Sequence, residues 1–145
     1  MKLVLDTDVI VAALRSPSGA SAELLRRARL GQLRLLVSVP LFLEYEAQCV
    51  LPEHLTAAGL NANEAGIVLD VLAAICESVQ THYLWRPLLR DPGDEMVLEA
   101  AINGGADALV TFNHRDFRHV PARFGLALWL PSEALRYLDS PGRTT

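Results

Sequence analysis

The sequence predicts an α/β protein with three layers (α/β/α), in which helices cover both faces of a central, mainly parallel sheet. Two observations favour this fold class. Short apolar runs alternate along the chain with longer segments whose apolar residues recur at helical spacing. The runs are apolar at successive positions, which is typical of strands buried on both faces of a parallel sheet.

The first half of the chain is expected to form two strands and four helices. Gly31 ends the second helix, and Pro40 suits the first turn of the third, with Ser38 or Val39 as its N-cap. Asn63 is expected to open the fourth. The expected elements are a strand at 2–5, helices at 7–14 and 22–30, a strand at 33–37, and helices at 40–50 and 63–76.

The second half is expected to add three strands and two helices. Gly104 and Gly105 end the first of these helices, and Pro131 begins the second. The expected elements are strands at 79–84, 106–112 and 124–130 and helices at 94–103 and 131–138. Residues 1–138 are therefore expected to form one domain, while residues 139–145 have nothing to bury and should form a frayed tail.

Composition restricts the classes of function. The chain has 145 residues and no apolar run as long as the roughly 18 residues that a membrane span needs, so no membrane partner is expected. An acidic pair at residues 6 and 8 interrupts the segment where a secretory signal would still be apolar, and we expect a cytoplasmic protein. The net charge of −4 argues against a grip on nucleic acid through bulk electrostatics, so such binding must use local patches and metal ions.

Cysteine and histidine spacing indicates no zinc or redox site. Cys49 and Cys76 are far apart and form no C-x-x-C pair, and they are expected to be buried free thiols. The four histidines show no H-E-x-x-H or other zinc spacing. We expect them to lie at the surface.

Acidic residues follow the predicted strands or open the predicted helices. In an open parallel sheet these positions lie at the carboxyl edge, where such folds build their sites. Clustered carboxylates repel and raise one another's pKa unless cations neutralise them, and such oxygen ligands select Mg²⁺ or Mn²⁺. Two such ions about 3.5–4 Å apart can orient a water and stabilise the leaving oxygen of a phosphodiester. The acids are Asp6, Asp8, Glu44, Asp91, Asp94 and Asp116.

Each acid also has a structural explanation. Asp91 could be a helix N-cap before Pro92, and Asp94 could be favoured by the helix dipole. Glu44 could be solvated, and Asp116 could close a turn. For one acid alone the structural explanation is favoured, but the joint pattern favours a site.

Three blocks of the sequence carry a resemblance to a known family. They are LVLDTDVIVAAL, SVPLFLEYEAQ and RDPGDEMVLEAAINGGADALVTFNHRDF. In this order they resemble the acidic motifs of the PIN-domain nucleases, in particular the VapC-like toxin components of bacterial toxin–antitoxin systems. The resemblance extends from Met1 to about Leu138. It implies a PIN-like fold and an Mg²⁺- or Mn²⁺-dependent endoribonuclease.

The resemblance also assigns roles to individual acids. It implies that the catalytic, metal-binding set is Asp6, Glu44, Asp94 and Asp116, with Asp91 as an additional metal ligand. The chain departs from the family pattern at three other positions. Asp8 stands where the family commonly has Asn, Asn113 where some members have an acid, and Gly93 where a polar residue is frequent.

Contacts to the substrate and to partners are also predicted. Small polar and basic residues near the acids could meet phosphates or orient a water, although hydroxyl residues are also common turn formers and arginines are often simply solvated. The candidates for substrate binding are Thr7, Thr111, Asn113 and Arg115, with Arg15 and Arg118 as further phosphate contacts. The resemblance implies RNA as substrate, an antitoxin partner and a homodimer, and helices over about 7–30 and 63–76 are expected to expose an apolar groove for the antitoxin.

Two alternatives remain open. Asp6-Thr7-Asp8 also resembles the start of a haloacid-dehalogenase-type phosphatase, but that family uses a downstream lysine and the chain's single lysine, Lys2, precedes Asp6. A non-catalytic binding module with the PIN fold is the second alternative. A pure scaffold has no physical reason to gather like charges at one edge, and the four main acids therefore favour an enzyme.

Overall fold

The computed structural model describes residues 1–82 and 88–140. The strands in this part of the chain are β1 (Lys2–Leu5), β2 (Arg34–Val37), β3 (Cys76–Ser78), β4 (Ala108–Val110) and β5 (Ala127–Trp129). The helices are α1 (Thr7–Arg15), α2 (Ala20–Arg29), α3 (Val39–Cys49), α4 (Pro52–Ala58), α5 (Ala62–Ile75), α6 (Pro92–Gly104), α7 (His114–Phe117), the 3₁₀ helix η1 (Pro121–Phe124) and α8 (Pro131–Leu138).

The described strands form a parallel sheet in the order β3-β2-β1-β4-β5. The central strand β1 pairs Leu3 with Leu35 of β2 on one side and with Ala108 of β4 on the other. Its apolar residues are almost fully buried, as expected for a strand covered on both faces. Because all the pairings are parallel, the carboxyl ends of the strands lie at one edge.

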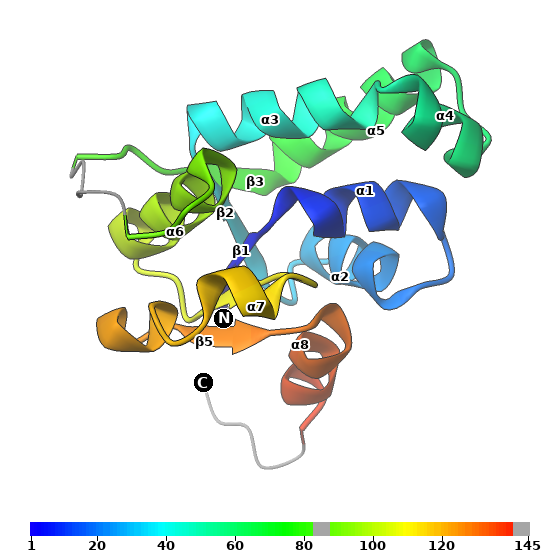
Figure 1. The fold of residues 1–145 in the computed structure, drawn as a ribbon. Coiled ribbons are helices and arrows are strands. Elements are labelled where there is room, and N and C mark those ends of the chain that lie inside the picture. The colour runs from blue at the N-terminus through cyan, green and yellow to red at the C-terminus, as the bar shows by residue number, and fades with distance from the viewer. Residues whose placement is uncertain (83–87, 141–145) are drawn as a thin grey trace.

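Helices cover both faces of this sheet, as Figure 1 shows. Helix α6 packs on β1, β2 and β4, and it lies to the left of the sheet in that view. Helices α1 and α2 lie to the right, and α8 packs against α2. Helices α3 and α5 pack together at the top, beyond β3. The predicted three-layer α/β/α fold is confirmed.

The strand expected at residues 79–84 is wrong. The strand is β3, Cys76–Ser78, and residues 83 and 84 lie outside the described part of the chain. Helix α5 runs directly into this strand, because the N–H of Cys76 still caps the helix by donating to Leu72 O. The ladder ends where Val79 N–H donates to Val37 O. With no turn between helix and strand, the sequence offered no signal for the boundary.

The starts of α5 and α6 also differ from expectation, and α2 begins at Ala20, two residues before the expected start at residue 22. Helix α5 is capped by Asn61 and not by Asn63: the Asn61 side chain accepts from Glu64 N–H and the Glu64 side chain accepts from Asn61 N–H. Helix α6 begins at Pro92, two residues before the expected start at Asp94, with Asp91 as its N-cap.

Two short α-helices were not expected, and neither was the 3₁₀ helix η1, whose last residue, Phe124, had been expected to begin a strand. Helix α4, Pro52–Ala58, begins at a proline and ends at Gly59, whose φ of +70° suits a glycine C-cap. Helix α7, His114–Phe117, is a single turn after β4. Helix α4 carries His54, and α7 carries Asp116.

The end of the described chain is held to α2. Asp139, which the sequence placed in a frayed tail, accepts two hydrogen bonds from Arg27, at 2.7 and 3.1 Å. Residues 141–145 lie outside the described part.

Within the described residues, no single helix is long and apolar enough to cross a membrane. Helices α4 and α5 reach that length and composition only together, and they meet at a bend of 87°.

Candidate functional site

Asp6 lies at the junction of β1 and α1. Its backbone N–H donates to Val110 O of β4 at 2.9 Å, so the chain leaves the sheet beside β4. Its side chain is the N-cap of α1 and accepts from Thr7 N–H at 2.7 Å. The residue is only 8% exposed. Asp6 therefore stands fixed at the carboxyl edge of the sheet.

The end of β4 joins Asp6 to Asp8. Thr111 is fully buried, and its hydroxyl donates to Asp6 Oδ2 at 2.7 Å and lies 3.4 Å from Asp8 Oδ2. The backbone N–H of Phe112 donates to the same oxygen of Asp8 at 3.2 Å. Donors from one strand end thus hold the first two acids of the chain together.

Asp91 and Asp94 enter the site from the start of α6. Asp91 caps the helix by accepting from Gly93 N–H at 2.7 Å, as the capping interpretation predicted, with Pro92 as the first helical residue. Asp94 is 7% exposed, and its Oδ2 is buried without a hydrogen-bond partner among the described residues. A capping acid and a buried acid therefore stand one after the other at this helix terminus.

Three carboxyl groups of the site, those of Asp6, Asp8 and Asp94, have raised pKa values. Burial, followed by repulsion from Asp6, Asp91, Asp116 and Asp8, raises the pKa of Asp94 to about 7. Burial, followed by repulsion from Asp6, raises the pKa of Asp8 to about 6. Burial raises the pKa of Asp6 as well, against the hydrogen bond from Thr111. Asp6, Asp8, Asp91 and Asp94 thus lie close together in a partly desolvated space, without a basic partner among the described residues.

An open cleft of about 580 Å³ gives access to the acids. Glu44 of α3 enters it one turn before Gln48, which donates to Glu44 Oε1 at 3.2 Å. Arg15, the last residue of α1, lies in the same wall. The lining residues are Asp6, Thr7, Asp8, Val11, Ala12, Arg15, Ser16, Glu44, Gln48, His54, Asp91, Gly93 and Asp94.

Asp116 joins this site through a chain of hydrogen bonds. Asn113 N–H donates to Thr111 Oγ1 at 2.9 Å, and Asn113 Nδ2 donates to Asp116 Oδ2 at 2.8 Å. Asp116 is exposed on α7 and lines a neighbouring cavity of about 300 Å³ with Arg118. Its charge contributes to the raised pKa of Asp94, so the two acids are close enough to interact.

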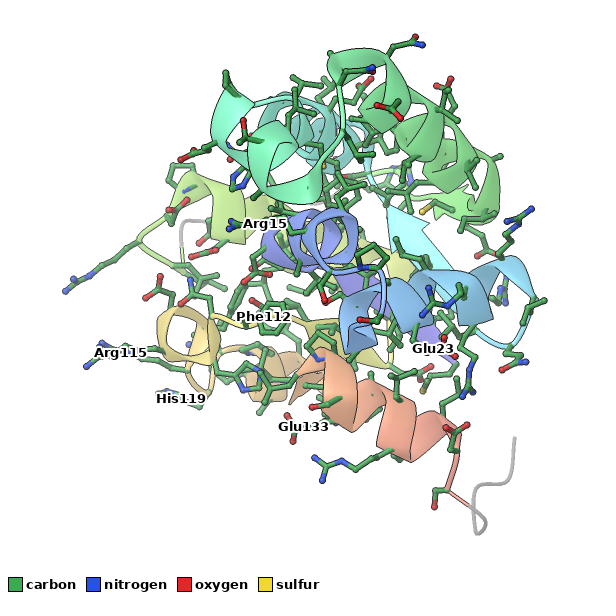
Figure 2. All side chains as sticks on the ribbon, turned by 90° about the vertical axis from the view of Figure 1, so that its right-hand side faces the viewer. Arg15, Glu23, Phe112, Arg115, His119 and Glu133 are labelled. Carbon is green, nitrogen blue, oxygen red and sulfur yellow. The ribbon has the colours of Figure 1, made fainter. Side chains whose placement is uncertain are left out.

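The substrate-binding candidates are distributed unevenly. Thr7 lines the cleft. Thr111 and Asn113 are not part of the cleft lining, and they donate hydrogen bonds to Asp6 and Asp116. Arg115 is exposed, and Figure 2 shows its side chain extending outward from α7. Arg15 instead lines the cleft, and within residues 1–82 and 88–140 it forms no salt bridge.

Comparison with known proteins identifies the family. The model of the PIN domain family matches residues 2–115, most of the chain. The chain belongs to the PIN domain family. A chain from the crystal structure of VapBC2 from Rickettsia felis, bound to a DNA fragment from their promoter, is similar in fold, with a TM-score of 0.60 and 17% identity. The match covers 88% of this chain and 97% of that chain. No curated protein matches the sequence significantly.

The donor set of this PIN domain fits a divalent cation. Buried oxygens of Asp8 and Asp94 have no hydrogen-bond partner among the described residues, and carboxylates are the ligands that Mg²⁺ and Mn²⁺ prefer. No group of three acidic, histidine or cysteine side chains in the described chain already forms a ligand set. A cation that keeps several waters needs only one or two carboxylates as direct ligands, which is the usual habit of Mg²⁺.

Sequence reasoning left several residues out of the site. Asp8 was noted as an acid but not assigned, although its position two residues after Asp6 was the available signal. Gln48 and His54 line the cleft and were missed. His54 lies on α4, and the Pro52-Glu53 start of that helix with Gly59 at its end was the signal that could have found it.

Proposed function

We propose that this PIN domain is an Mg²⁺- or Mn²⁺-dependent endoribonuclease that hydrolyses phosphodiester bonds of RNA. One observation supports the proposal most strongly: buried oxygens of Asp8 and Asp94, which have no hydrogen-bond partner among the described residues, belong to acids that line an open cleft, and the pKa of Asp94 is raised to about 7. Such crowding opposes folding unless a positive ligand repays it. A function that requires bound cations explains why the chain has such a crowded group of carboxylates.

Asp6 and Asp94 would hold the cation as the most buried acids, together with Asp8. We propose Asp6, Glu44, Asp91, Asp94 and Asp116 as the metal-binding residues, with Asp6, Glu44, Asp94 and Asp116 as the catalytic acids. A bound divalent cation supplies charge stabilisation at the phosphate and lowers the pKa of a water.

The chain's other residues hold these acids in place. Thr111 fixes one oxygen of Asp6, Thr7 N–H fixes the other, and Asn113 orients Asp116. Asp91 closes the first turn of α6, which keeps Asp94 directed into the cleft wall. Of the residues predicted to bind substrate, Thr7, Thr111 and Asn113 thus position the acids, and Arg115 remains a proposed phosphate contact. Arg15 is the cleft residue suited to a phosphate.

The phosphatase alternative finds no support in the geometry. Lys2 begins β1 and Asp6 follows its end, so the two backbones are separated by the length of the strand, about 13 Å. The lysine therefore lies toward the opposite edge of the sheet from the acids. No described residue offers the cationic phosphoryl-holding group beside Asp6 that this chemistry requires, apart from Arg15 at the far end of α1.

We further propose that the chain is the toxin of a toxin–antitoxin pair, acts in the cytoplasm and forms a homodimer. The fold is shared with a chain of a VapBC complex. Apolar side chains on α3 and α5 are exposed and available for partner contacts: Val39, Leu43, Ile67 and Val71. A small apolar groove of about 150 Å³ lies between α2 and α5. Residues 1–138 would form the functional domain.

The test is cleavage of single-stranded RNA by the purified protein. We expect cleavage with Mg²⁺ or Mn²⁺, its loss on chelation, and a loss of about a hundredfold or more in Asp6→Asn, as for removal of a metal ligand. Asp70→Asn, an exposed carboxylate on α5, is the matched control and should cleave as the unaltered protein does. Activity that survives chelation or the Asp6→Asn change would refute the mechanism.

The partner proposal has its own test. Expression of the chain alone should slow growth of a bacterial host, and co-expression of the protein encoded next to it should relieve the effect. If the chain does not slow host growth and remains a monomer, the toxin proposal is contradicted, while the nuclease proposal is unaffected.

A further inference from the structure

Phe112 is a half-exposed aromatic residue beside the acidic cleft. It follows Thr111 at the end of β4, and its side chain is 51% exposed. Its backbone N–H donates to Asp8 Oδ2 at 3.2 Å, so its main chain touches the acidic cluster directly. The residue does not belong to the cleft lining, which places the ring next to the cleft and not inside it.

The backbone that carries this ring is anchored on both sides. Thr111 N–H donates to Trp129 O at 3.0 Å, and the Thr111 hydroxyl is engaged with Asp6. Asn113 N–H then donates to Thr111 Oγ1 at 2.9 Å. The backbone of Phe112 is therefore held at a fixed position relative to the acids, which a loop without these hydrogen bonds would not achieve.

No ring in the described part of the chain stacks on Phe112, in contrast to Trp129 and Tyr137, whose centroids lie 4.7 Å apart. Leaving an aromatic ring half in water forfeits part of the stabilisation that its burial would give. The pairing of an exposed ring with an anchored backbone indicates a surface built for contact.

The position and the charge of the protein indicate the contacting ligand. A chain with net charge −4 gains little general attraction for a polyanion, so its affinity for RNA must come from local contacts. Stacking of bases on aromatic rings is such a contact, since every base has an apolar face. A base is joined to its phosphate through one sugar, so a ring beside a phosphate-cutting site is within reach of a base.

We propose that Phe112 is a stacking platform for one unpaired base of the RNA, next to the phosphate at the acidic cluster. The inference rests on the proposed nuclease function and deepens it, because it selects single-stranded RNA: bases in a duplex are already stacked on their neighbours and cannot cover the ring. In the view of Figure 2, Phe112 lies below Arg15 of α1 and to the right of Arg115 of α7. Both arginines are exposed and form no salt bridge within residues 1–82 and 88–140, so each could meet a flanking phosphate.

The first test is binding of a short single-stranded RNA with Ca²⁺ in place of Mn²⁺, with the RNA checked to be intact. Phe112→Ala should weaken binding about fivefold to 150-fold, the range that loss of one stacked base gives. Phe112→Trp should bind as well as the unaltered protein, and Phe112→Leu, which keeps the apolar bulk, should resemble Phe112→Ala. Leu30→Ala, at an exposed apolar position just after α2, is the control and should leave binding unchanged.

The second test removes the base instead of the ring. An RNA that lacks the base at the stacked position should bind the unaltered protein as weakly as complete RNA binds Phe112→Ala. Combining the two changes should weaken binding no further than either change alone. Equal binding by Phe112→Ala and the unaltered protein would overturn the inference, as would full binding by Phe112→Leu. Loss of self-association with unchanged RNA affinity would show that the ring faces protein. An unaltered protein that neither binds nor cuts RNA would refute the proposed function itself, and the inference with it.

Discussion

Replacement of Asp94 by asparagine should make the metal-free protein more stable while abolishing cleavage. Asp94 is 7% exposed, and its pKa is raised to about 7 by burial and by the neighbouring acids. An unfolded chain returns this carboxyl group to its ordinary value of 3.8. Above about pH 4, therefore, ionisation favours the unfolded chain, and the destabilisation grows until the folded group also ionises near pH 7.

The size of the effect follows from those two pKa values. At about 1.4 kcal/mol for each pH step between 3.8 and about 7, the buried carboxylate opposes folding at neutral pH by about 4 kcal/mol. Asparagine removes this charge but leaves a buried amide with incomplete hydrogen bonding, which costs about 1–3 kcal/mol. The net gain should be about 1–3 kcal/mol, or roughly 3–9 °C in Tm for a chain of this size.

The assay is thermal unfolding in chelator at a series of pH values. Asp94→Asn should melt above the unaltered protein at pH 7–8, and the difference should shrink or reverse near pH 4, where the folded carboxyl group is protonated. Asp70→Asn, on the exposed face of α5, should show neither change. A lower Tm for Asp94→Asn at every pH, together with normal cleavage, would refute the reasoning and leave Asp94 as a residue of the helix terminus alone.

The remaining predictions concern the cation and the residues around it. Mn²⁺ at a hundred times its Kd should stabilise the unaltered protein by about 2.7 kcal/mol, and melting curves of Asp6→Asn should show little of that gain; an equal gain in both would remove Asp6 from the site. Thr111→Val deletes the hydrogen bond that lowers the pKa of Asp6, so the acid limb of the pH–rate profile should move to higher pH; an unmoved limb would contradict the positioning role. Asp91→Asn keeps an N-cap and should retain stability while losing activity, whereas Asp91→Ala should also lose about 1 kcal/mol of folding free energy in a melting comparison; full activity in both variants would make Asp91 a cap and nothing more.

Much of the fold could be predicted from the sequence because its strongest signals are local. Apolar runs predicted β1 with its exact bounds and β2 to within one residue, and Pro131 predicted the start of α8. The edge strand β3 was misplaced because α5 passes into it without a turn. Helices α4 and α7 are too short to show a helical period.

Part of the site could likewise be predicted from the sequence, and part of it depends on tertiary contacts. The order of strands and helices predicts that Asp6 and Asp94 meet at the carboxyl edge of the sheet. Asp6 follows a strand and Asp94 opens the helix that comes after another strand, and in a parallel sheet both positions lie at that edge. The role of Thr111 as a donor to Asp6 depends on side-chain direction across 105 residues, which no local pattern encodes. The cleft wall at His54 depends on how α4 packs against α1, which is a tertiary contact.

The central claim is that the acids around Asp6 and Asp94 hold a divalent cation. The most direct measurement is a crystal structure of the protein grown with Mn²⁺, with anomalous scattering used to locate the ion. The account predicts a manganese peak within ligand distance of Asp6 or Asp94 and absent from crystals of Asp6→Asn. Crystals at neutral pH that show no peak in the cleft, or a peak only at other carboxylates such as Asp70, would contradict it.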